Sequence, residues 1–235
     1  MSEITQIPYQ ANIMHLADLQ KYAKFSSTLI EELTLTMENQ TIGAKFMDPS
    51  HVTLCEWQIP TLGQLGRTGV RSDEFAKTLA RFSGESIDIS QKDYMKFRAG
   101  KKTIELRQIE PSNENVPTPK IVDFQQFGLK FKQFQEISKD LRPIGADYLT
   151  MYLHGSKMEY SATSDQGSII DEIEIDGYFE TGIRSTYSME WLESPKILKA
   201  DMVCSIAKDK PLKIVIGSKD SGPYIEYWQA PRVES

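Results

Sequence analysis

Residues 92–106 read KDYMKFRAGKKTIEL, and residues 208–227 read KDKPLKIVIGSKDSGPYIEY. Each stretch starts with Lys-Asp, alternates apolar with charged residues, passes a glycine (Gly100 or Gly217) and ends in a second alternating run. This pattern predicts two β-strands joined by a tight turn. The second stretch starts 116 residues after the first in a chain of 235 residues. We therefore interpret the chain as two copies of one domain, with a chance similarity between two hairpins as the alternative.

Each half also contains two segments with helical periodicity, around residues 16–23, 75–82, 134–141 and 189–192. Ser72 or Asp73 is a candidate N-cap for the second of them, and Pro195 either starts a new turn after the fourth or kinks it. The other apolar segments are predicted strands: 33–37, 42–46, 52–57, 87–90, 148–153, 158–161, 169–175 and 202–207. The expected fold class is α+β, with two similar domains of antiparallel sheet and two helices each.

Between the halves, residues 110–120 read EPSNENVPTPK. Three prolines among polar residues fit neither a central strand nor a helix interior, so this segment is expected to be an extended linker. The predicted organisation is an N-terminal domain at 1–110, a connecting linker at 111–122 and a C-terminal domain at 123–235.

The composition predicts an ordered globular protein, with 40% hydrophobic residues and no extreme segment. No apolar run approaches the roughly 20 residues of a membrane span, and the N-terminus lacks the pattern of a signal peptide. Cys55 and Cys204 lie in strand-like contexts, which favours buried, reduced thiols in an intracellular protein. The net charge of −6 argues against a surface that coats nucleic acid all over, but allows a restricted basic face.

Three motifs carry a resemblance to a known family. Residues 46–54 read FMDPSHVTL, residues 209–212 read DKPL and residues 227–234 read YWQAPRVE. Together they resemble the PCNA family of DNA sliding clamps, nearest to archaeal-type sequences, over essentially the whole chain. The resemblance implies a closed, pseudo-six-fold ring of three such chains, with helices around the hole and sheets on the outside.

The resemblance also implies a function. The chain is expected to be a DNA polymerase processivity factor that encircles double-stranded DNA without reading its sequence, in replication and repair. Polymerase, flap nuclease, ligase and clamp loader would bind through short peptide motifs. No enzymatic activity, cofactor, metal or membrane is expected, and the location would be the cytoplasm or nucleoid for an archaeal-type protein and the nucleus for a eukaryotic one.

All four candidate helices carry at least two Lys or Arg residues in a chain that is acidic overall. Each cation alone is best interpreted as part of a solvated helix face, but together they favour a positive surface that attracts phosphates. The predicted DNA-facing residues are Lys21, Lys24, Lys77, Arg81, Lys139, Arg142, Lys196 and Lys199. Lys77 and Lys139 align with pore cations of the family, whereas Ala80, Glu136 and Glu190 depart from a basic pattern.

The resemblance implies a pocket for partner peptides on the front face of the ring. Its predicted residues are Met47, His51, Val52, Leu54, Val116, Ile121, Val122, Pro211, Tyr227, Ala230 and Pro231. Partners would insert a short helical turn with apolar anchors there. Gln229 stands where an apolar residue is common, which indicates an altered preference at the rim.

The cluster Asp48, Ser50 and His51 raises the alternative of a small hydrolase centred on His51. Catalytic triads seldom come from sequence neighbours, and the other two histidines lack metal-ligand spacing. We prefer a structural interpretation, in which Pro49 fixes a turn and Asp48 and Ser50 bond nearby backbone.

Two segments, 103–109 and 168–175, are predicted edge strands that would pair between subunits and close a ring; interior strands are the alternative. The predicted interface residues are Thr103, Glu105, Arg107, Ile169, Asp171 and Ile173. Charge complementarity would join an acidic set with a basic set: Asp171, Glu172 and Glu174 with Arg107, Lys101 and Lys102. A homotrimer, a heteromeric or damage-signalling clamp subunit, and a peptide-binding adaptor without a DNA role all remain open.

Overall fold

The computed structural model describes residues 9–38, 40–112 and 116–232. The tail residues Val233 and Glu234 of the C-terminal motif lie outside the described residues, as do linker residues 113–115. By its contacts the chain divides into two compact units. The first unit comprises Met1–Phe46, Glu56–Val116 and Gly217–Ile225, and the second comprises Met47–Cys55, Pro117–Ile216 and Glu226–Ser235.

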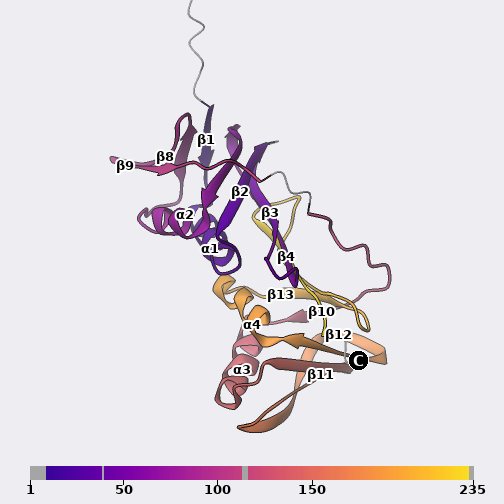
Figure 1. Cartoon of the computed structure of the whole chain (residues 1–235). Coiled ribbons are helices and arrows are strands. Elements are labelled where there is room, and N and C mark those ends of the chain that lie inside the picture. Colours follow the sequence, from indigo (N-terminus) through magenta and orange to yellow (C-terminus); the bar gives the residue numbers. More distant parts are fainter. Residues whose placement is uncertain (1–8, 39, 113–115, 233–235) are drawn as a thin grey trace, which may run out of the picture. The chain divides into compact units, whose positions relative to one another are not determined.

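The first unit contains two antiparallel arrays of strands and two helices (Figure 1). One array has the order β5-β1-β7-β8-β9, and β4-β3-β2-β6 are neighbours in the other. The strands are β1 (Tyr9–Ile13), β2 (Glu32–Glu38), β3 (Thr41–Met47), β4 (Thr53–Pro60), β5 (Leu62–Gln64), β6 (Gly66–Arg71), β7 (Ile87–Gln91), β8 (Tyr94–Ala99) and β9 (Lys102–Arg107). The helices are α1 (Leu16–Ser26) and α2 (Ser72–Leu79).

Helices α1 and α2 pack against each other and bury their predicted apolar faces. The indole N–H of Trp57 on β4 donates to the Ser26 hydroxyl at 3.0 Å, and the Phe75 and Phe97 rings lie 6.0 Å apart. The predicted N-cap of α2 is wrong. Helix α2 begins at Ser72 itself, whose hydroxyl donates to backbone carbonyls of the segment between α1 and β2, including that of Glu31 at 3.1 Å.

The second unit contains strands in the order β11-β12-β10-β13-β14-β15, with its helices packed on β12. The strands are β10 (Gln125–Leu129), β11 (Tyr148–Ser164), β12 (Gly167–Ser188), β13 (Met202–Ile206), β14 (Leu212–Gly217) and β15 (Tyr224–Gln229). The helical elements are α3 (Phe131–Leu141), α4 (Met189–Leu192) and the 3₁₀ helices η1 (Arg142–Ile144) and η2 (Ser194–Leu198). Pro195 lies in the first turn of η2, so it starts a new turn after α4.

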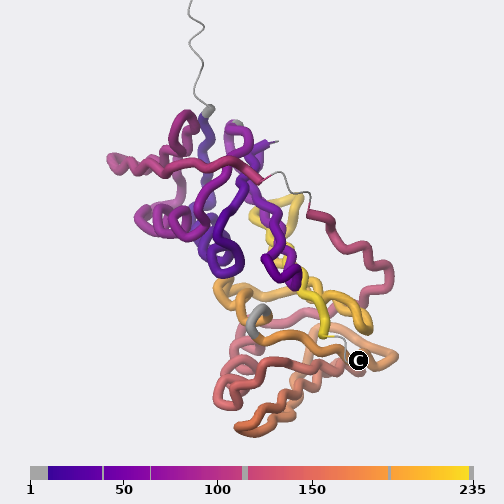
Figure 2. The backbone as a smooth tube through the Cα atoms, viewed as in Figure 1, coloured from indigo at the N-terminus to yellow at the C-terminus, as the bar shows by residue number. Residues whose placement is uncertain are grey.

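Three sequence predictions gain detail from the fold. The predicted strands 148–153 and 158–161 are one strand, β11, whose pairing with β12 shifts register around Gly155. Both predicted hairpins are present, as β8–β9 and β14–β15, and their turn glycines have positive φ angles of 57° at Gly100 and 79° at Gly217. Cys55 and Cys204 are buried thiols. Figure 2 follows the chain through both units.

Candidate DNA-facing helices, partner pocket and subunit edges

The loop 48–53 in the second unit is built around one buried carboxylate. Oδ1 of Asp48, which is 1% exposed, accepts hydrogen bonds from the backbone of Val52 at 2.8 Å and of Thr53, and Oδ2 accepts the Ser50 N–H at 2.8 Å. A carboxylate satisfied by several backbone donors fixes a loop rigidly. The structural interpretation of Asp48 is therefore confirmed, whereas Ser50 takes part through its backbone.

The loop holds His51 in an exposed position with a φ of 56°. Its Nδ1 lies 3.0 Å from the sulfur of Met47. A thioether cannot orient an imidazole as a general base in the way that a carboxylate does. Within the described ranges, no group of three His, Cys, Asp or Glu residues could hold a metal ion.

The C-terminal strand joins this loop. The backbone N–H of Ala230 donates to the Val52 carbonyl at 2.8 Å, and Tyr227 is buried, with 1% exposure. Burial raises the pKa of Tyr227 far above its usual range, with the nearby Cys55 and Asp48 adding to the shift, so its phenol stays neutral.

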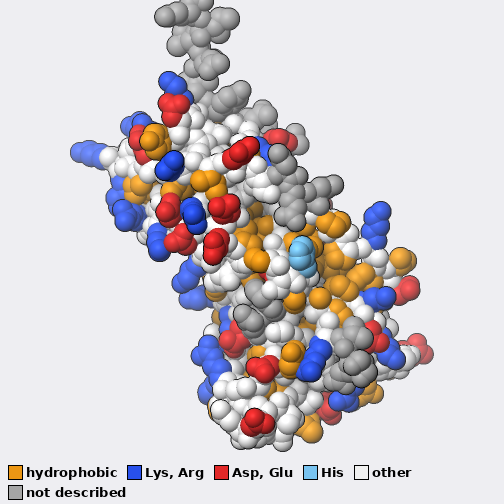
Figure 3. Space-filling view, viewed as in Figure 1, with side chains coloured by type: hydrophobic (Ala, Val, Ile, Leu, Met, Phe, Trp, Pro, Cys, Tyr) orange, Lys and Arg blue, Asp and Glu red, His pale blue; other side chains and the backbone are white. Residues whose placement is uncertain are grey.

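The predicted pocket residues differ in exposure. The half-buried ones include Met47, Val52, Ile121, Pro211, Ala230 and Pro231. Leu54 is buried, and Val122 is 92% exposed. Val116 is buried and belongs to the first unit. Figure 3 shows hydrophobic side chains gathered around the histidine visible in that view.

Gln229 corrects one expectation. Its side chain is fully buried, and its amide N–H donates to the Ser188 carbonyl at 2.7 Å. It therefore lies beneath the surface, and the prediction that it alters the rim is wrong.

A hollow of about 560 Å³ lies beside the second half of the linker. It is lined by Lys120, Ile121, Val122, Thr181, Ile183 and Lys210, among others. Two of the three linker residues predicted to cover a partner peptide, Ile121 and Val122, thus border an open surface of the second unit, and Val116 does not.

The four predicted cations of the first unit fall into two classes. Two are paired with an aspartate on the same helix, Lys21 with Asp18 at 3.2 Å and Lys77 with Asp73 at 2.8 Å. The hydrogen bond from Lys77 to Asp73 raises the pKa of Lys77, which therefore stays charged. Lys24 and Arg81 are exposed, and no ion-pair partner is found for them in the described part of the chain. Over α1 and α2, Figure 3 shows acidic and basic side chains intermingled.

The four predicted cations of the second unit also divide into acid-paired residues and residues without an ion-pair partner in the described structure. Glu193 lies 2.6 Å from the Lys196 ammonium and 3.7 Å from Nε of Arg142, and it accepts a hydrogen bond from Ser138. Burial opposes ionisation of Glu193, but the hydrogen bonds from Lys196 and Ser138 outweigh it and lower its pKa. The other two predicted cations are exposed and have no ion-pair partner among the described residues: Lys139 and Lys199.

Both predicted edge segments include open strand edges, but Ile109 at the end of the first segment pairs with Gly69. Strand β9 is the last strand of its sheet, and Thr103, Glu105 and Arg107 on it are exposed. Strand β12 pairs with β11 along its length and meets β10 at Gly128↔Asp176. On that second side, no backbone pairing is found for residues 168–173 within the described structure. Ile169 and Ile173 are half-buried and Asp171 is exposed.

The DNA polymerase sliding clamp of Nitrosopumilus maritimus is 31% identical to this chain over 241 residues, covering 93% of the chain and 96% of the relative. The chain belongs to the family of DNA polymerase sliding clamps. The predicted resemblance is therefore confirmed. No family model matches the chain.

Two solved clamp structures share the fold. The crystal structure of the PCNA2–PCNA3 complex from Sulfolobus tokodaii superposes with a TM-score of 0.81 at 21% identity, over 96% of this chain and 100% of that chain. The A. fulgidus PCNA with the C-terminal region of FEN-1 bound gives 0.82 at 18% identity, over 96% and 99%. The predicted α+β clamp fold is thus confirmed, and no described helix of this clamp is long and apolar enough to cross a membrane.

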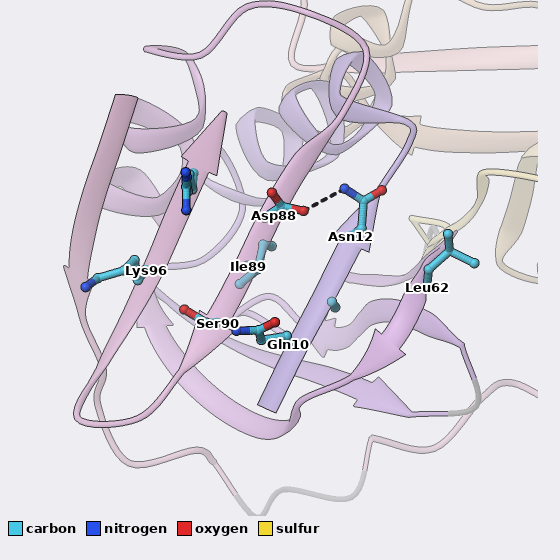
Figure 4. A pocket seen from close by; sticks show the side chains of 9 residues that line it. Gln10, Asn12, Leu62, Asp88, Ile89, Ser90 and Lys96 are labelled. Atoms are coloured by element: carbon cyan, nitrogen blue, oxygen red, sulfur yellow. Dashed lines mark hydrogen bonds between the residues drawn. The ribbon is translucent and has the colours of Figure 1, made fainter. Parts of the chain in front are cut away.

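The clamp has a further hollow that the sequence did not indicate. It measures about 470 Å³ on the five-stranded array of the first unit and is lined by side chains of β1, β5, β7 and β8. Figure 4 shows the amide of Asn12 donating to Asp88, with Gln10, Ser90 and Lys96 farther along the same sheet; the hydrogen bond measures 2.7 Å. Its lining mixes both charges, so it favours no ligand class.

Proposed function

We propose that this clamp chain assembles into a ring that encircles duplex DNA and keeps DNA polymerases on it. The observation that carries the proposal is a set of eight Lys and Arg residues in a chain with net charge −6. Six lie within α1, α2, α3, η1 and η2, and Arg81 and Lys199 directly follow α2 and η2. Four of the eight have no ion-pair partner in the described structure and are available to phosphates: Lys24, Arg81, Lys139 and Lys199.

The binding mode follows from the chemistry of these residues. Lysine and arginine attract phosphate oxygens, which every base pair presents alike, so these interactions carry no sequence information. A ring held by such diffuse attraction can slide along DNA while remaining around it. A bound polymerase then rebinds its template at high effective concentration after each dissociation.

The pocket formed by the loop 48–53 and the C-terminal strand would receive short peptide motifs of polymerase, flap nuclease, ligase and clamp loader. Support comes from the rigid loop, the half-buried apolar side chains beside it and the hollow along the linker. We infer that residues 1–110 and 123–235 are the two clamp domains and that residues 111–122 connect them.

We infer that the protein has no catalytic activity of its own. His51 faces a methionine sulfur rather than a carboxylate, and the turn residues beside it are occupied with backbone hydrogen bonds. The clamp would act by encircling DNA, and its partners would carry out the chemical reactions.

The DNA-facing assignment can be tested with two matched quadruple variants. In the first, Lys24, Arg81, Lys139 and Lys199 are changed to Ala; in the second, the acid-paired Lys21, Lys77, Arg142 and Lys196 are changed to Ala. Affinity for two duplexes of unrelated sequence is measured by fluorescence anisotropy as a function of salt. The first variant should weaken binding to both duplexes equally and reduce the salt slope by about one unit for each phosphate that is no longer neutralised.

The second variant should reduce the slope less, because a carboxylate already competes for each of those cations. If neither variant changes the affinity or its salt dependence, these helices do not face DNA. If the two duplexes respond differently, the protein reads base sequence and the proposed mode is wrong.

A further inference from the structure

Three lysines line the hollow beside the linker. Lys120 comes from the end of the linker, and Lys208 and Lys210 come from the turn between β13 and β14. All three are exposed, and no ion-pair partner is found for them in the described part of the chain. Among the described residues that line the hollow, Asp123 is the one carboxylate. The hollow therefore carries an excess of positive charge in a chain whose net charge is −6.

The turn that carries two of these lysines is held in a fixed conformation. The Lys210 N–H donates to the Ala207 carbonyl at 3.2 Å, and the hydroxyl of the buried Tyr187 donates to the Lys210 carbonyl at 3.1 Å. Asp209 at the centre of the turn has a φ of 54°, a left-handed conformation that Asp adopts in tight turns. Because the backbone is already ordered, binding a ligand has to order only the lysine side chains, which lowers its entropic cost.

The same hollow presents apolar side chains and open backbone. Ile121 is half-buried, Val122 is 92% exposed, and Ile183 of β12 also lines the hollow. Residues 120–123 belong to no helix or strand, and no backbone hydrogen bond is found for them in the described structure. An extended peptide can pair with such backbone while its side chains contact the apolar residues.

The combination discriminates between classes of ligand. A nucleic acid would use the lysines through its phosphates but would leave the apolar side chains without partners. A peptide with apolar anchors alone would gain nothing from the lysines. A peptide that carries carboxylates beside its apolar anchors matches both features of the hollow. A single exposed ion pair contributes little, but three cations around one hollow also attract an acidic peptide before contact.

We propose that this hollow selects partner peptides with Asp or Glu residues next to their apolar anchors, and that Lys120, Lys208 and Lys210 bind those carboxylates. The proposal rests on the proposed function, in which this part of the clamp receives short peptides, and it adds the charge of those peptides. Lys or Arg residues in the same positions of a peptide would be repelled. The clamp thereby distinguishes peptides with equal apolar anchors by their flanking charge.

A random peptide library tests this preference without assuming a partner. Phage that display short random peptides are selected on the unaltered chain and on the hollow variant, which combines Lys120→Gln, Lys208→Gln and Lys210→Gln. Selection on the unaltered chain should enrich aromatic or aliphatic anchors flanked by Asp or Glu. The hollow variant should yield the anchors without the acidic flanks.

A thermodynamic cycle then assigns the preference to the lysines. The most enriched acidic peptide is synthesised as selected and with its acidic residues changed to Gln, and both are titrated by fluorescence anisotropy. The hollow variant should bind the acidic peptide about tenfold more weakly than the unaltered chain does, and raised salt should shrink this difference. The two proteins should bind the Gln peptide within about twofold of each other, since the cycle isolates the interaction between the charges.

The matched control removes the same charge from three other exposed lysines. Lys24→Gln, Lys139→Gln and Lys199→Gln lie on or directly after helical elements, and none of these residues lines the hollow. This control should bind the acidic peptide as the unaltered chain does and bind duplex DNA more weakly. The hollow variant should show the opposite pattern. Far-UV circular dichroism should show the same fold for both, because all six substituted side chains are exposed.

The outcomes separate this proposal from the clamp function. Selected peptides without acidic flanks, or an acidic peptide that binds the hollow variant as tightly as the unaltered chain, overturn the proposal and leave the clamp function standing. A hollow variant with weakened DNA affinity shows that these lysines serve nucleic acid, which also overturns it. If no peptide is enriched at all, peptide docking at this surface is wrong. A control variant with unchanged DNA affinity instead contradicts the DNA-facing assignment and leaves the peptide preference standing.

Discussion

The two repeated hairpins place the same ion pair in different surroundings. In β8–β9, Lys96 and Glu105 lie 2.8 Å apart with side-chain exposures of 48% and 50%. In β14–β15, Lys213 and Glu226 also lie 2.8 Å apart, but their exposures are 26% and 7%. The repeat thus sets the strands and the cross-strand pair, while the surroundings decide what the pair contributes to stability.

Trp228 accounts for much of the difference. Its indole N–H donates to Glu226 at 2.6 Å, and the Lys213 ammonium lies 5.0 Å from its ring centroid. The first hairpin has no equivalent aromatic side chain on the pair, since Arg107 follows Leu106 where Trp228 follows Tyr227. The first hairpin ends in an open strand edge, and the second ends in a buried strand that leads to Ala230, which bonds the loop 48–53.

The largest effect is expected from removing the buried acid. Glu226→Ala leaves the Lys213 ammonium and the Trp228 N–H without their acceptor, and should lower the free energy of unfolding by about 3 kcal/mol. Glu105→Ala removes an exposed pair and should cost no more than about 0.5 kcal/mol. Urea unfolding at one fixed protein concentration measures both, because assembly makes stability concentration-dependent. Equal losses would contradict the comparison.

The next largest difference in stability is expected between substitutions of the two turn glycines. At Gly217 a Cβ atom would lie 2.0 Å from the Pro223 carbonyl oxygen, whereas at Gly100 nothing lies within 4 Å. Gly217→Ala should therefore cost about 2 kcal/mol or more, and Gly100→Ala about 1 kcal/mol for its left-handed backbone alone. Thermal unfolding of the two variants side by side checks the order, and the reverse order would show that the second turn can relax.

A smaller change isolates the aromatic contribution. Trp228→Phe keeps a ring above Lys213 but removes the N–H that Glu226 accepts, which should cost about 1 kcal/mol. Trp57→Phe is the matched change in the first unit, where the indole donates to a neutral hydroxyl instead of a carboxylate. It should cost less, because hydrogen bonds to charged groups contribute more. A larger loss for Trp57→Phe would contradict this order.

The smallest effect concerns acid stability. The pKa of Glu193 is lowered from 4.5 in the folded state, so its ion pairs stabilise the fold above about pH 4.5 and are lost as the pH falls through the lowered pKa. Glu193→Gln should flatten the fall in stability below that pH. Asp73→Asn, at the exposed Lys77 pair, should change the profile less. Thermal melts from pH 7 to pH 3 test this prediction. A stability that falls more steeply with decreasing pH in Glu193→Gln than in the unaltered chain would contradict it.

Much of the fold was predictable because local signals agreed with the tertiary structure. The apolar spacing of Leu16, Leu19 and Tyr22 predicted α1, and the glycine turns predicted both hairpins. The long strands β11 and β12 were predicted only in pieces. Gly155 and a shift in register interrupt the alternation, and pairing with a distant strand, which the local sequence does not reveal, holds them together.

The candidate site was less predictable, because it depends on which charges meet. The partners of Lys21 and Lys77 stand three and four residues earlier, at helical spacing, so the sequence did carry that signal. By contrast, Glu193 joins Arg142 from another element, and Tyr160 joins Asp140 to Asp171. Such convergence depends on the fold, and no local pattern predicts it.

Retention on DNA with blocked ends tests the central claim most directly. The protein is mixed with linear duplex carrying biotin at both ends, streptavidin then blocks the ends, and the salt is raised before gel filtration. A ring around the duplex should co-elute with the blocked DNA at high salt and be released when a restriction enzyme cuts the duplex once. Loss of the protein from intact, blocked DNA at high salt, or retention unchanged by cutting, would contradict encirclement.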